Sequence, residues 1–359
     1  MRARVLLRGL VVCGLLWATW AWPATAGAQV VSTSPVNLAP AVAAAGDLPR
    51  LHSFLVSWRG ALLAEHYFNG ARGDRPANIK SASKSVISAL VGIAIERGLI
   101  RGVDEPVISY FPEHVKGEPR KQRITVEDLL TMRSGLESTS SRNYGAWVLS
   151  RNWVQHALAR PLITEPGMSM QYSTGNTHLL SAILTRATGG STRQFAQRAL
   201  ADPLGFALAE WPRDPQGVYF GGNDMLMTPR QMLAFGTLYL ERGRAGDRQV
   251  VPGTWVEESF IPRARSPRSE QLYGYGWWLR ELAGHQVAYA WGYGGQYIFV
   301  VPAVDLVVVT TSSTASGEER RSHRVTVMDL VERFVIPAVD EAARASIPRM
   351  TAGLLPQSR

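Results

Sequence analysis

The order of apolar and polar positions predicts strands near both ends of the chain and helices between them. Residues 54–58 and 61–68 are apolar runs on either side of Arg59-Gly60, the pattern of a β-hairpin with Gly at its turn. Strands are expected again late in the chain, at residues 274–280, 286–291, 297–301 and 306–312. We therefore predict an α/β sheet domain built from both ends of the chain.

Helices are predicted between these strands and after them. Residues 85–95 are almost uniformly apolar, and Glu96-Arg97-Gly98 follows as a stop, which indicates a buried helix. Further helix candidates are residues 125–130, 153–158, 178–187 and 228–240, and an amphipathic segment at 325–344 closes the chain. The predicted division is a discontinuous sheet domain, residues 51–112 and 263–345, interrupted by a mostly helical domain at residues 113–262.

The first residues have the composition of a secretory signal peptide. Arg2, Arg4 and Arg8 precede an apolar run at residues 9–22, and small residues end at Ala28. An uncleaved membrane anchor is the alternative, but such a run is short for a bilayer core. We expect cleavage after Ala28, a leader or linker at residues 29–50, and an exported protein, periplasmic or secreted.

Cleavage changes what the composition implies. The 359 residues carry a formal charge of +9, and removal of residues 1–28 takes away three Arg and the only Cys, leaving 331 residues and +6. The mature chain then has no disulfide, Cys nucleophile or zinc-thiolate site. Arg is interleaved with Asp and Glu, which argues against nucleic acid as a partner. Neither metal nor cofactor is expected. Metal-like spacing is lacking among His66, His156, His178 and His285.

Ser81-Ala82-Ser83-Lys84, at the start of the apolar helix, is the sharpest candidate for chemistry. Side chains three apart share one helix face, so the Lys84 amine can approach the Ser81 hydroxyl. Burial would lower the pKa of Lys84 and let its neutral amine accept the Ser81 proton, while the helix N-terminus favours a developing oxyanion. The alternative is that Ser81 caps the helix and Lys84 is a solvated residue of the first turn.

Two later segments favour the chemical interpretation. The stretch from Glu165 to Ser173 places the phenol of Tyr172 before a helix. Trp291-Gly292-Tyr293-Gly294-Gly295-Gln296 opens a strand with few side chains to obstruct its backbone N–H groups. A nucleophile, an assisting Lys or Tyr and a second oxyanion donor are the parts that acyl transfer requires. Taken singly, Tyr172 is also compatible with a buried ring, and Gly294-Gly295 with a turn or bulge.

Together these motifs resemble the serine β-lactamase superfamily in its class C and esterase-like branch. The sequence is most similar to 6-aminohexanoate-dimer hydrolases and family VIII-type carboxylesterases, over residues 51 to 340. The resemblance implies an antiparallel sheet flanked by helices, β-lactamase/transpeptidase-like, with an inserted, mostly helical domain and the active site between them.

The resemblance also implies roles for individual residues. Ser81 would be the acylated nucleophile and Lys84 its base, while Tyr172 would relay the proton to the leaving group and help to activate the deacylating water. Backbone N–H groups of Ser81 and Gln296 would form the oxyanion hole. Tyr293, Gly294 and Gly295 would line the bound substrate.

The chain departs from the class C pattern at two places. Tyr-x-Asn reads Tyr172-Ser173-Thr174, with Asn176 two residues further on, and Lys-Thr-Gly reads Tyr293-Gly294-Gly295. The second change removes a cation and a hydroxyl that would hold a β-lactam carboxylate.

We therefore predict an exported serine hydrolase that cleaves a small-molecule ester or amide through an acyl-Ser81 intermediate. The alternatives are a D-alanyl-D-alanine carboxypeptidase or β-lactamase, and a catalytically inactive homologue that binds cell-wall fragments or a partner. Neither the natural substrate nor the oligomeric state follows from the sequence.

Overall fold

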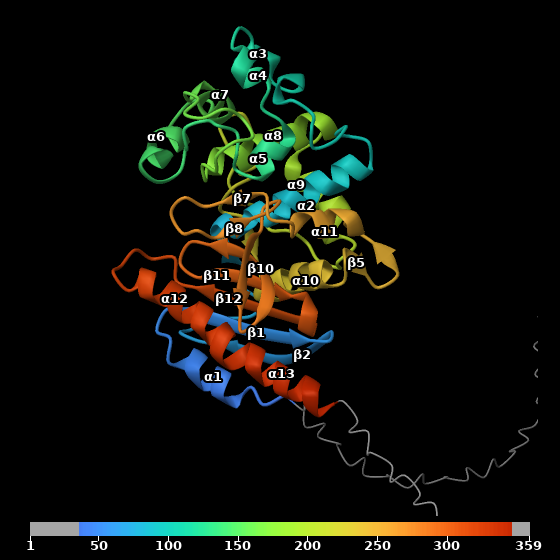
Figure 1. Ribbon diagram of the computed structural model, residues 1–359, viewed down its shortest axis with the longest axis vertical. Helices are drawn as coiled ribbons and strands as arrows, with labels where there is room; N and C mark the ends of the chain where they lie inside the picture. Colours follow the sequence, from blue (N-terminus) through green and yellow to red (C-terminus); the bar gives the residue numbers. More distant parts are fainter. Residues whose placement is uncertain (1–35, 347–359) are drawn as a thin grey trace, which may run out of the picture. The chain divides into compact units, whose positions relative to one another are not determined.

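The computed structural model describes residues 36–346. Their main feature is an antiparallel sheet of eight strands in the order β2-β1-β12-β11-β10-β9-β8-β7 (Figure 1). The strands are β1 (Leu51–Trp58), β2 (Ala61–Tyr67), β7 (Ala264–Arg265), β8 (Leu272–Tyr273), β9 (Trp278–Leu282), β10 (His285–Gly292), β11 (Gln296–Val301) and β12 (Leu306–Ser312). The fold class predicted from the sequence, an antiparallel sheet with flanking helices, is confirmed.

Strands from the two ends of the chain pair with each other near one edge of the sheet. Strand β1 pairs with β12, from Leu51 opposite Ser312 to Trp58 opposite Leu306. The predicted hairpin of β1 and β2 is present, and its turn residues Arg59 and Gly60 both have positive φ. Four short strands form two separate pairs: β3 (Ala77–Asn78) with β4 (Leu226–Met227), and β5 (Arg244–Ala245) with β6 (Arg248–Gln249).

Both faces of the central strands are covered, which explains why β11 and β12 are apolar at successive positions rather than alternating. Val307 and Val309 belong to a core shared with α10 (Pro229–Leu240), whereas Leu306 and Val308 face the opposite core. That second core is closed by α1 (Ala39–Gly46), α12 (Arg320–Leu330), a π-helical turn η6 (Val331–Val335) and α13 (Ile336–Ala345) (Figure 1). Helix α1 lies within residues 29–50, which the sequence predicts as a leader or linker, so part of that segment is a packed helix.

The segment between β2 and β7 is mainly helical (Figure 1). Its α-helices are α2 (Ser83–Glu96), α3 (Pro112–Val115), α4 (Pro119–Gln122), α5 (Val126–Leu130), α6 (Tyr144–Val148), α7 (Trp153–Ala159), α8 (Thr174–Thr188), α9 (Thr192–Ala196), α10 and α11 (Gly253–Ser259). Short 3₁₀ or π turns complete it: η1 (Lys80–Ala82), η2 (Val107–Ser109), η3 (Ser141–Asn143) and η4 (Gln197–Ala201), with η5 (Pro302–Val304) between β11 and β12. Helix α2 is the buried helix that the apolar run predicts.

One predicted strand begins later than expected. Residues 274–277 form a turn before β9, because Gly276 adopts a positive φ and packs against the backbone of Lys84, where a Cβ would lie 2.9 Å from the Lys84 carbonyl oxygen. The signal-peptide prediction lies outside the described residues. The division into sheet and helical domains stays a prediction. Within residues 36–346 no helix is long and apolar enough to cross a membrane.

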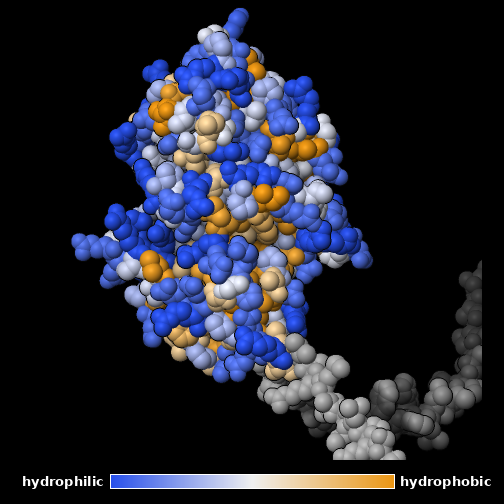
Figure 2. Space-filling model, in the orientation of Figure 1, coloured by the Kyte–Doolittle hydropathy of each residue, from blue (hydrophilic) through white to orange (hydrophobic). Residues whose placement is uncertain are grey.

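Hydrophilic residues cover most of the visible face of the molecule, and apolar residues gather near its middle (Figure 2).

Candidate active site

The Ser-x-x-Lys segment forms a 3₁₀ turn that leads directly into a buried helix. Ser81 lies in η1 and is half-buried, whereas Lys84, in the first turn of α2, is only 2% exposed. The Lys84 ammonium donates to Ser81 Oγ at 3.1 Å and also to the carbonyl oxygen of Gly222. Helix α2 has Ala82 as its N-cap residue and no side-chain cap. The alternative of a capping Ser81 and a solvated Lys84 is therefore wrong.

Burial controls the charge of Lys84. Loss of hydration lowers the pKa of Lys84 to about 7, and the negative charge of Asp224 opposes this shift only in part. An amine with this pKa is neutral in a large fraction of molecules at neutral pH. Lys84 can therefore accept the proton of the Ser81 hydroxyl, with which it is already hydrogen-bonded.

Tyr172 completes the group around Lys84. It precedes Ser173, the N-cap residue of α8, and its ring centroid lies 5.0 Å from the Lys84 Nζ. The ring is stacked on Trp278 at 5.6 Å between centroids and meets Tyr273 edge-on, which fixes its orientation.

The hydroxyl of Tyr172 is buried and makes no hydrogen bond of normal geometry with the described residues. Burial raises the pKa of Tyr172 to about 12, although the neighbouring Ser81 hydroxyl lowers it in part. Tyr172 is therefore a neutral phenol at physiological pH. It can pass a proton on only if another group, such as the Lys84 amine, supplies one in exchange.

The amide that class C relatives place two residues after the tyrosine is replaced by Thr174, whose hydroxyl bonds to Ser140 at 2.9 Å. Asn176 lies further along α8, where its Oδ1 accepts a hydrogen bond from Ser134 at 3.1 Å. Neither residue is a hydrogen-bond partner of Lys84. The second hydrogen-bond partner of Lys84 is instead the carbonyl oxygen of Gly222.

The late Gly-rich segment is the turn between β10 and β11, and it lies beside the nucleophile. A Cβ on Gly292 would sit 2.1 Å from the carbonyl oxygen of Ile79, two residues before Ser81, so this approach requires glycine. Gly294 and Gly295 have φ of 94° and 111°, a conformation that side chains disfavour. The Gln296 side chain is held on β12 by hydrogen bonds of 2.7 and 3.1 Å to the Ser312 backbone. Oxyanion donation by Ser81 and Gln296, and substrate contact by the turn, stay predictions.

Two features of the site escape sequence reasoning. Loop residues 220–224 reach Lys84 because Gly221 and Gly222 pack directly against the backbone of α8. A Cβ on Gly221 would lie 2.3 Å from the Thr177 carbonyl oxygen, and a Cβ on Gly222 would lie 2.6 Å from that of Thr174. The Gly-Gly pair is the sequence signal for this close approach. Nothing in the local sequence signals the second feature, a cation over the late turn.

That cation is Arg320, at the start of α12, whose guanidinium lies 4.3 Å from the centroid of the Tyr293 ring. Tyr293 stands where the Lys-Thr-Gly pattern has its lysine, so a positive charge from another element returns to this position. The same helix places the buried His323 within 2.9 Å of Ser312 Oγ. Burial is the main cause that lowers the pKa of His323 to about 4, and the charges of Arg50 and His52 lower it further. The contact with Ser312 is therefore made by a neutral ring.

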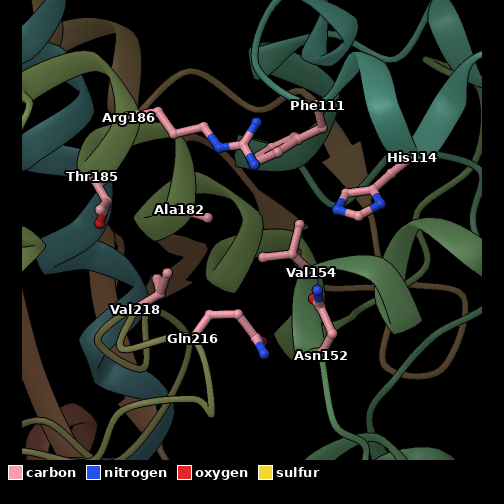
Figure 3. A pocket seen from close by; sticks show the side chains of 9 residues that line it. All are labelled: Phe111, His114, Asn152, Val154, Ala182, Thr185, Arg186, Gln216 and Val218. Carbon is pink, nitrogen blue, oxygen red and sulfur yellow. The ribbon is translucent and has the colours of Figure 1, made fainter.

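Two cavities of the described residues are lined by other side chains than Ser81, Lys84 and Tyr172. One of about 450 Å³ is lined by residues that include Met168, Gln171 and Arg263, so it borders the segment that leads into Tyr172. Another, of about 220 Å³, lies among helices (Figure 3). Its lining residues are Phe111, His114, Asn152, Val154, Ala182, Thr185, Arg186, Gln216 and Val218.

The histidines considered from the sequence serve other contacts. His178 is fully buried and bonds to Asp214 at 3.0 Å, and His285 lies 3.0 Å from Asp340. His66 stacks on Phe68. Within residues 36–346 no group of three or more His, Cys, Asp or Glu side chains is placed to hold a metal ion.

Comparison with known proteins agrees with this geometry. The β-lactamase family profile matches residues 52–332, and the chain belongs to that family. It is 27% identical to the 6-aminohexanoate-dimer hydrolase of Paenarthrobacter ureafaciens over 302 residues, 76% of this chain and 74% of that protein. Among solved structures, the fold resembles EstCE1, a hydrolase with promiscuous acyltransferase activity (TM-score 0.66, 18% identity, 82% of this chain and 98% of that one).

A Bacillus anthracis structure with a provisional assignment as a 6-aminohexanoate-dimer hydrolase has the same fold (TM-score 0.69, 21% identity, 82% of this chain and 80% of that one). The resemblance inferred from the motifs and the β-lactamase/transpeptidase-like fold are thus confirmed. The protein is a β-lactamase-fold hydrolase related to amidases and esterases.

Proposed function

We propose that the protein is an exported serine hydrolase that cleaves a carboxylic ester or amide through an acyl-Ser81 intermediate. The observation that carries this proposal is the buried Lys84, with a pKa lowered to about 7 and a 3.1 Å hydrogen bond to Ser81 Oγ. A lysine in this state is an activated base rather than a structural cation. Export rests on the basic and apolar composition of residues 1–28.

Acylation begins with transfer of the Ser81 hydroxyl proton to the neutral Lys84 amine. Ser81 Oγ bonds to the substrate carbonyl carbon, and the carbonyl π electrons move to oxygen, where backbone N–H groups of Ser81 and Gln296 stabilise the charge. The C–O or C–N bond to the leaving group then breaks. Tyr172 donates its hydroxyl proton to the leaving oxygen or nitrogen and takes the proton from Lys84, which regenerates the neutral amine.

Deacylation repeats these steps with water as the nucleophile. The Tyr172–Lys84 pair removes a proton from water as its oxygen bonds to the acyl carbon, and the ester bond to Ser81 breaks as Oγ regains a proton. The product is a carboxylic acid. All proton transfers are served by three side chains on η1, on α2 and before α8.

We expect a fluorophosphonate to add to Ser81, because an activated serine oxygen bonds to its phosphorus as fluoride leaves, which gives a phosphonate ester. Intact-mass measurement followed by peptide mapping locates the adduct, and Ser81→Ala is the control that should stay unlabelled. Turnover of p-nitrophenyl esters or short amide oligomers by Ser81→Ala at the wild-type rate would refute the proposal. Absence of labelling by both the phosphonate and penicillin would favour the inactive, ligand-binding alternative.

The rate of acylation should rise with pH and level off above neutrality. The neutral amine of Lys84 is the active form, so kcat/KM is small below its pKa and reaches a plateau above it, with a midpoint near the pKa of about 7. Tyr172 stays protonated through this range because its pKa is about 12. The measurement is kcat/KM for p-nitrophenyl acetate between about pH 5 and pH 9. A flat profile would contradict Lys84 as the base.

One observation favours a second candidate, a D-alanyl-D-alanine carboxypeptidase or β-lactamase. Arg320 over Tyr293 supplies a cation where the Lys-Thr-Gly pattern would provide one for a substrate carboxylate. Two measurements test this candidate. A stable penicillin adduct on Ser81 indicates a penicillin-binding carboxypeptidase, and rapid hydrolysis of nitrocefin indicates a β-lactamase.

A further inference from the structure

One loop binds both lysines that flank the nucleophile. The Gly222 carbonyl accepts a hydrogen bond from Lys84, and Asp224 accepts one from Lys80 at 2.8 Å. Lys80 directly precedes Ser81, and Lys84 is three residues after it. Residues 222–224 therefore contact the nucleophile segment on both sides of Ser81, and the Lys80–Asp224 pair belongs to the same small group of side chains as the catalytic base.

The backbone at this ion pair is unusual. Lys80 and Asp224 have φ of 52° and 61°, left-handed values that are uncommon for residues other than glycine. Asn78 holds both partners, because its Nδ2 donates to Asp224 at 2.8 Å and its Oδ1 accepts from the Lys80 backbone N–H at 3.0 Å. Strained residues that the surroundings hold in place occur preferentially at functional sites.

The ion pair is only partly screened by water. The Lys80 and Asp224 side chains are 23% and 20% exposed, so their charges act on nearby groups more strongly than those of a fully exposed pair. Within residues 36–346, Asp224 is the carboxylate whose charge acts on Lys84, in the direction that favours the ammonium form.

Three tyrosines belong to the elements near this group of side chains. Tyr172 lies before α8, and its ring meets that of Tyr273 on β8 edge-on. Tyr144 on α6 accepts a hydrogen bond from Asn223. Burial raises the pKa of all three, so they are neutral in the working range. Asp224 is then the charge that acts on Lys84, and Lys80 is the charge paired with Asp224.

We propose that Lys80 and Asp224 are positioning residues that act through Lys84: Asp224 attracts the ammonium form of the base, and Lys80 limits that attraction by neutralising Asp224. The inference rests on the proposed function, because it concerns the protonation of the base in acylation. It assigns to an ion pair outside the Ser-x-x-Lys segment the control of the pH at which that segment becomes reactive.

Two substitutions should displace the pH midpoint of kcat/KM for p-nitrophenyl acetate in opposite directions. Asp224→Asn removes the attraction, so Lys84 loses its proton more easily and the midpoint falls by roughly one pH unit. Lys80→Met leaves the Asp224 charge uncompensated, and the midpoint rises by roughly the same amount. Asn is also among the side chains that best tolerate the left-handed backbone at position 224. A merely structural pair would give both variants the same direction of change.

Asp305→Asn is the matched control. Asp305 also has a left-handed φ, of 54°, and pairs with Arg59, whose φ is 50°. This pair is more than half exposed and follows the C-terminal end of β11, whereas Gln296 begins that strand. Its midpoint should equal that of the wild type. Lys80→Arg keeps the charge and should also return the wild-type midpoint.

Midpoints that move together, or that do not move, would overturn the inference, as would a Lys80→Arg midpoint displaced as far as that of Lys80→Met. The rate of fluorophosphonate labelling against pH gives the midpoint for variants with slow turnover. If Lys80→Met fails to fold, Asp224→Asn and Lys80→Arg decide alone. A wild-type Ser81 that labels at no pH would refute the proposed function, whereas normal labelling with unmoved midpoints would refute only this inference.

Discussion

Replacement of Lys84 by alanine is expected to slow the acylation of Ser81 by about 10²–10⁴-fold, the range that a positioned general base contributes. The Ser81 hydroxyl would lose its hydrogen-bonded proton acceptor, and bulk water is a weaker base. The measurement is the rate of fluorophosphonate labelling, together with the pre-steady-state release of p-nitrophenol. The pH midpoint near 7 should disappear from the residual activity, because the titrating amine is absent.

A matched control separates the chemistry from the loss of a buried lysine. Lys121 is the other buried lysine of the described chain, 4% exposed and paired with Glu118 at 3.0 Å, without a contact to Ser81. Lys121→Ala should label at the wild-type rate. Circular dichroism and the thermal midpoint should show Lys84→Ala to be folded, since removal of the amine leaves one backbone acceptor, Gly222 O, without its partner. Acylation of folded Lys84→Ala at the wild-type rate would identify another residue as the base.

Replacement of Tyr172 by phenylalanine should lower kcat/KM, which reports acylation, by about 10²–10⁴-fold for an alkyl ester while the fold is retained. The ring can keep its stacking on Trp278, so the change removes only a hydroxyl whose pKa of about 12 keeps it protonated. Substrates with poor leaving groups should suffer most, because an alkoxide or amide nitrogen needs the donated proton, whereas p-nitrophenolate leaves without it. The comparison is therefore between an alkyl ester and a p-nitrophenyl ester of the same acid.

The control for this change is Tyr239→Phe. Tyr239, on α10, also has a buried hydroxyl, and burial raises its pKa to about 12, but it packs against Phe235 and Trp277 in the core. Its loss should leave the ratio between the two esters unchanged. An equal loss of rate on both esters in Tyr172→Phe would point to a role in holding Lys84 rather than in proton transfer.

Much of the fold was predictable, because apolar periodicity reports burial directly. Helix α2 and the hairpin of β1 and β2 follow from runs of apolar residues with clear turn signals. Helix α1 was missed, since its sequence, Ala39 to Gly46, is small and weakly patterned and is held by packing against the C-terminal helices. The turn at residues 274–277 was missed for a similar reason: its backbone is set by contact with α2 rather than by its own residues.

The candidate site divides in the same way. Ser81 and Lys84 are close in sequence, so helix geometry alone brings them together, and the structure places Tyr172 beside them as the family resemblance implies. The contacts of Lys84 with Gly222 and of Tyr293 with Arg320 join distant segments. The Gly221-Gly222 pair is the local signal for the first contact, and the second has none. The loss of the Lys-Thr-Gly lysine therefore did not reveal that another helix returns a cation to the same place.

The pairing of β1 with β12 has a consequence for the order in which the protein becomes active. Leu51 pairs with Ser312, so the second neighbour of β1, strand β12, is synthesised only after most of the chain. The Gln296 side chain also depends on Ser312. Pairings between such distant residues form late in folding. A nascent chain that already contains Ser81, Lys84 and Tyr172 is thus expected to stay inactive until the C-terminal strands have been made, which postpones hydrolysis until synthesis is nearly complete.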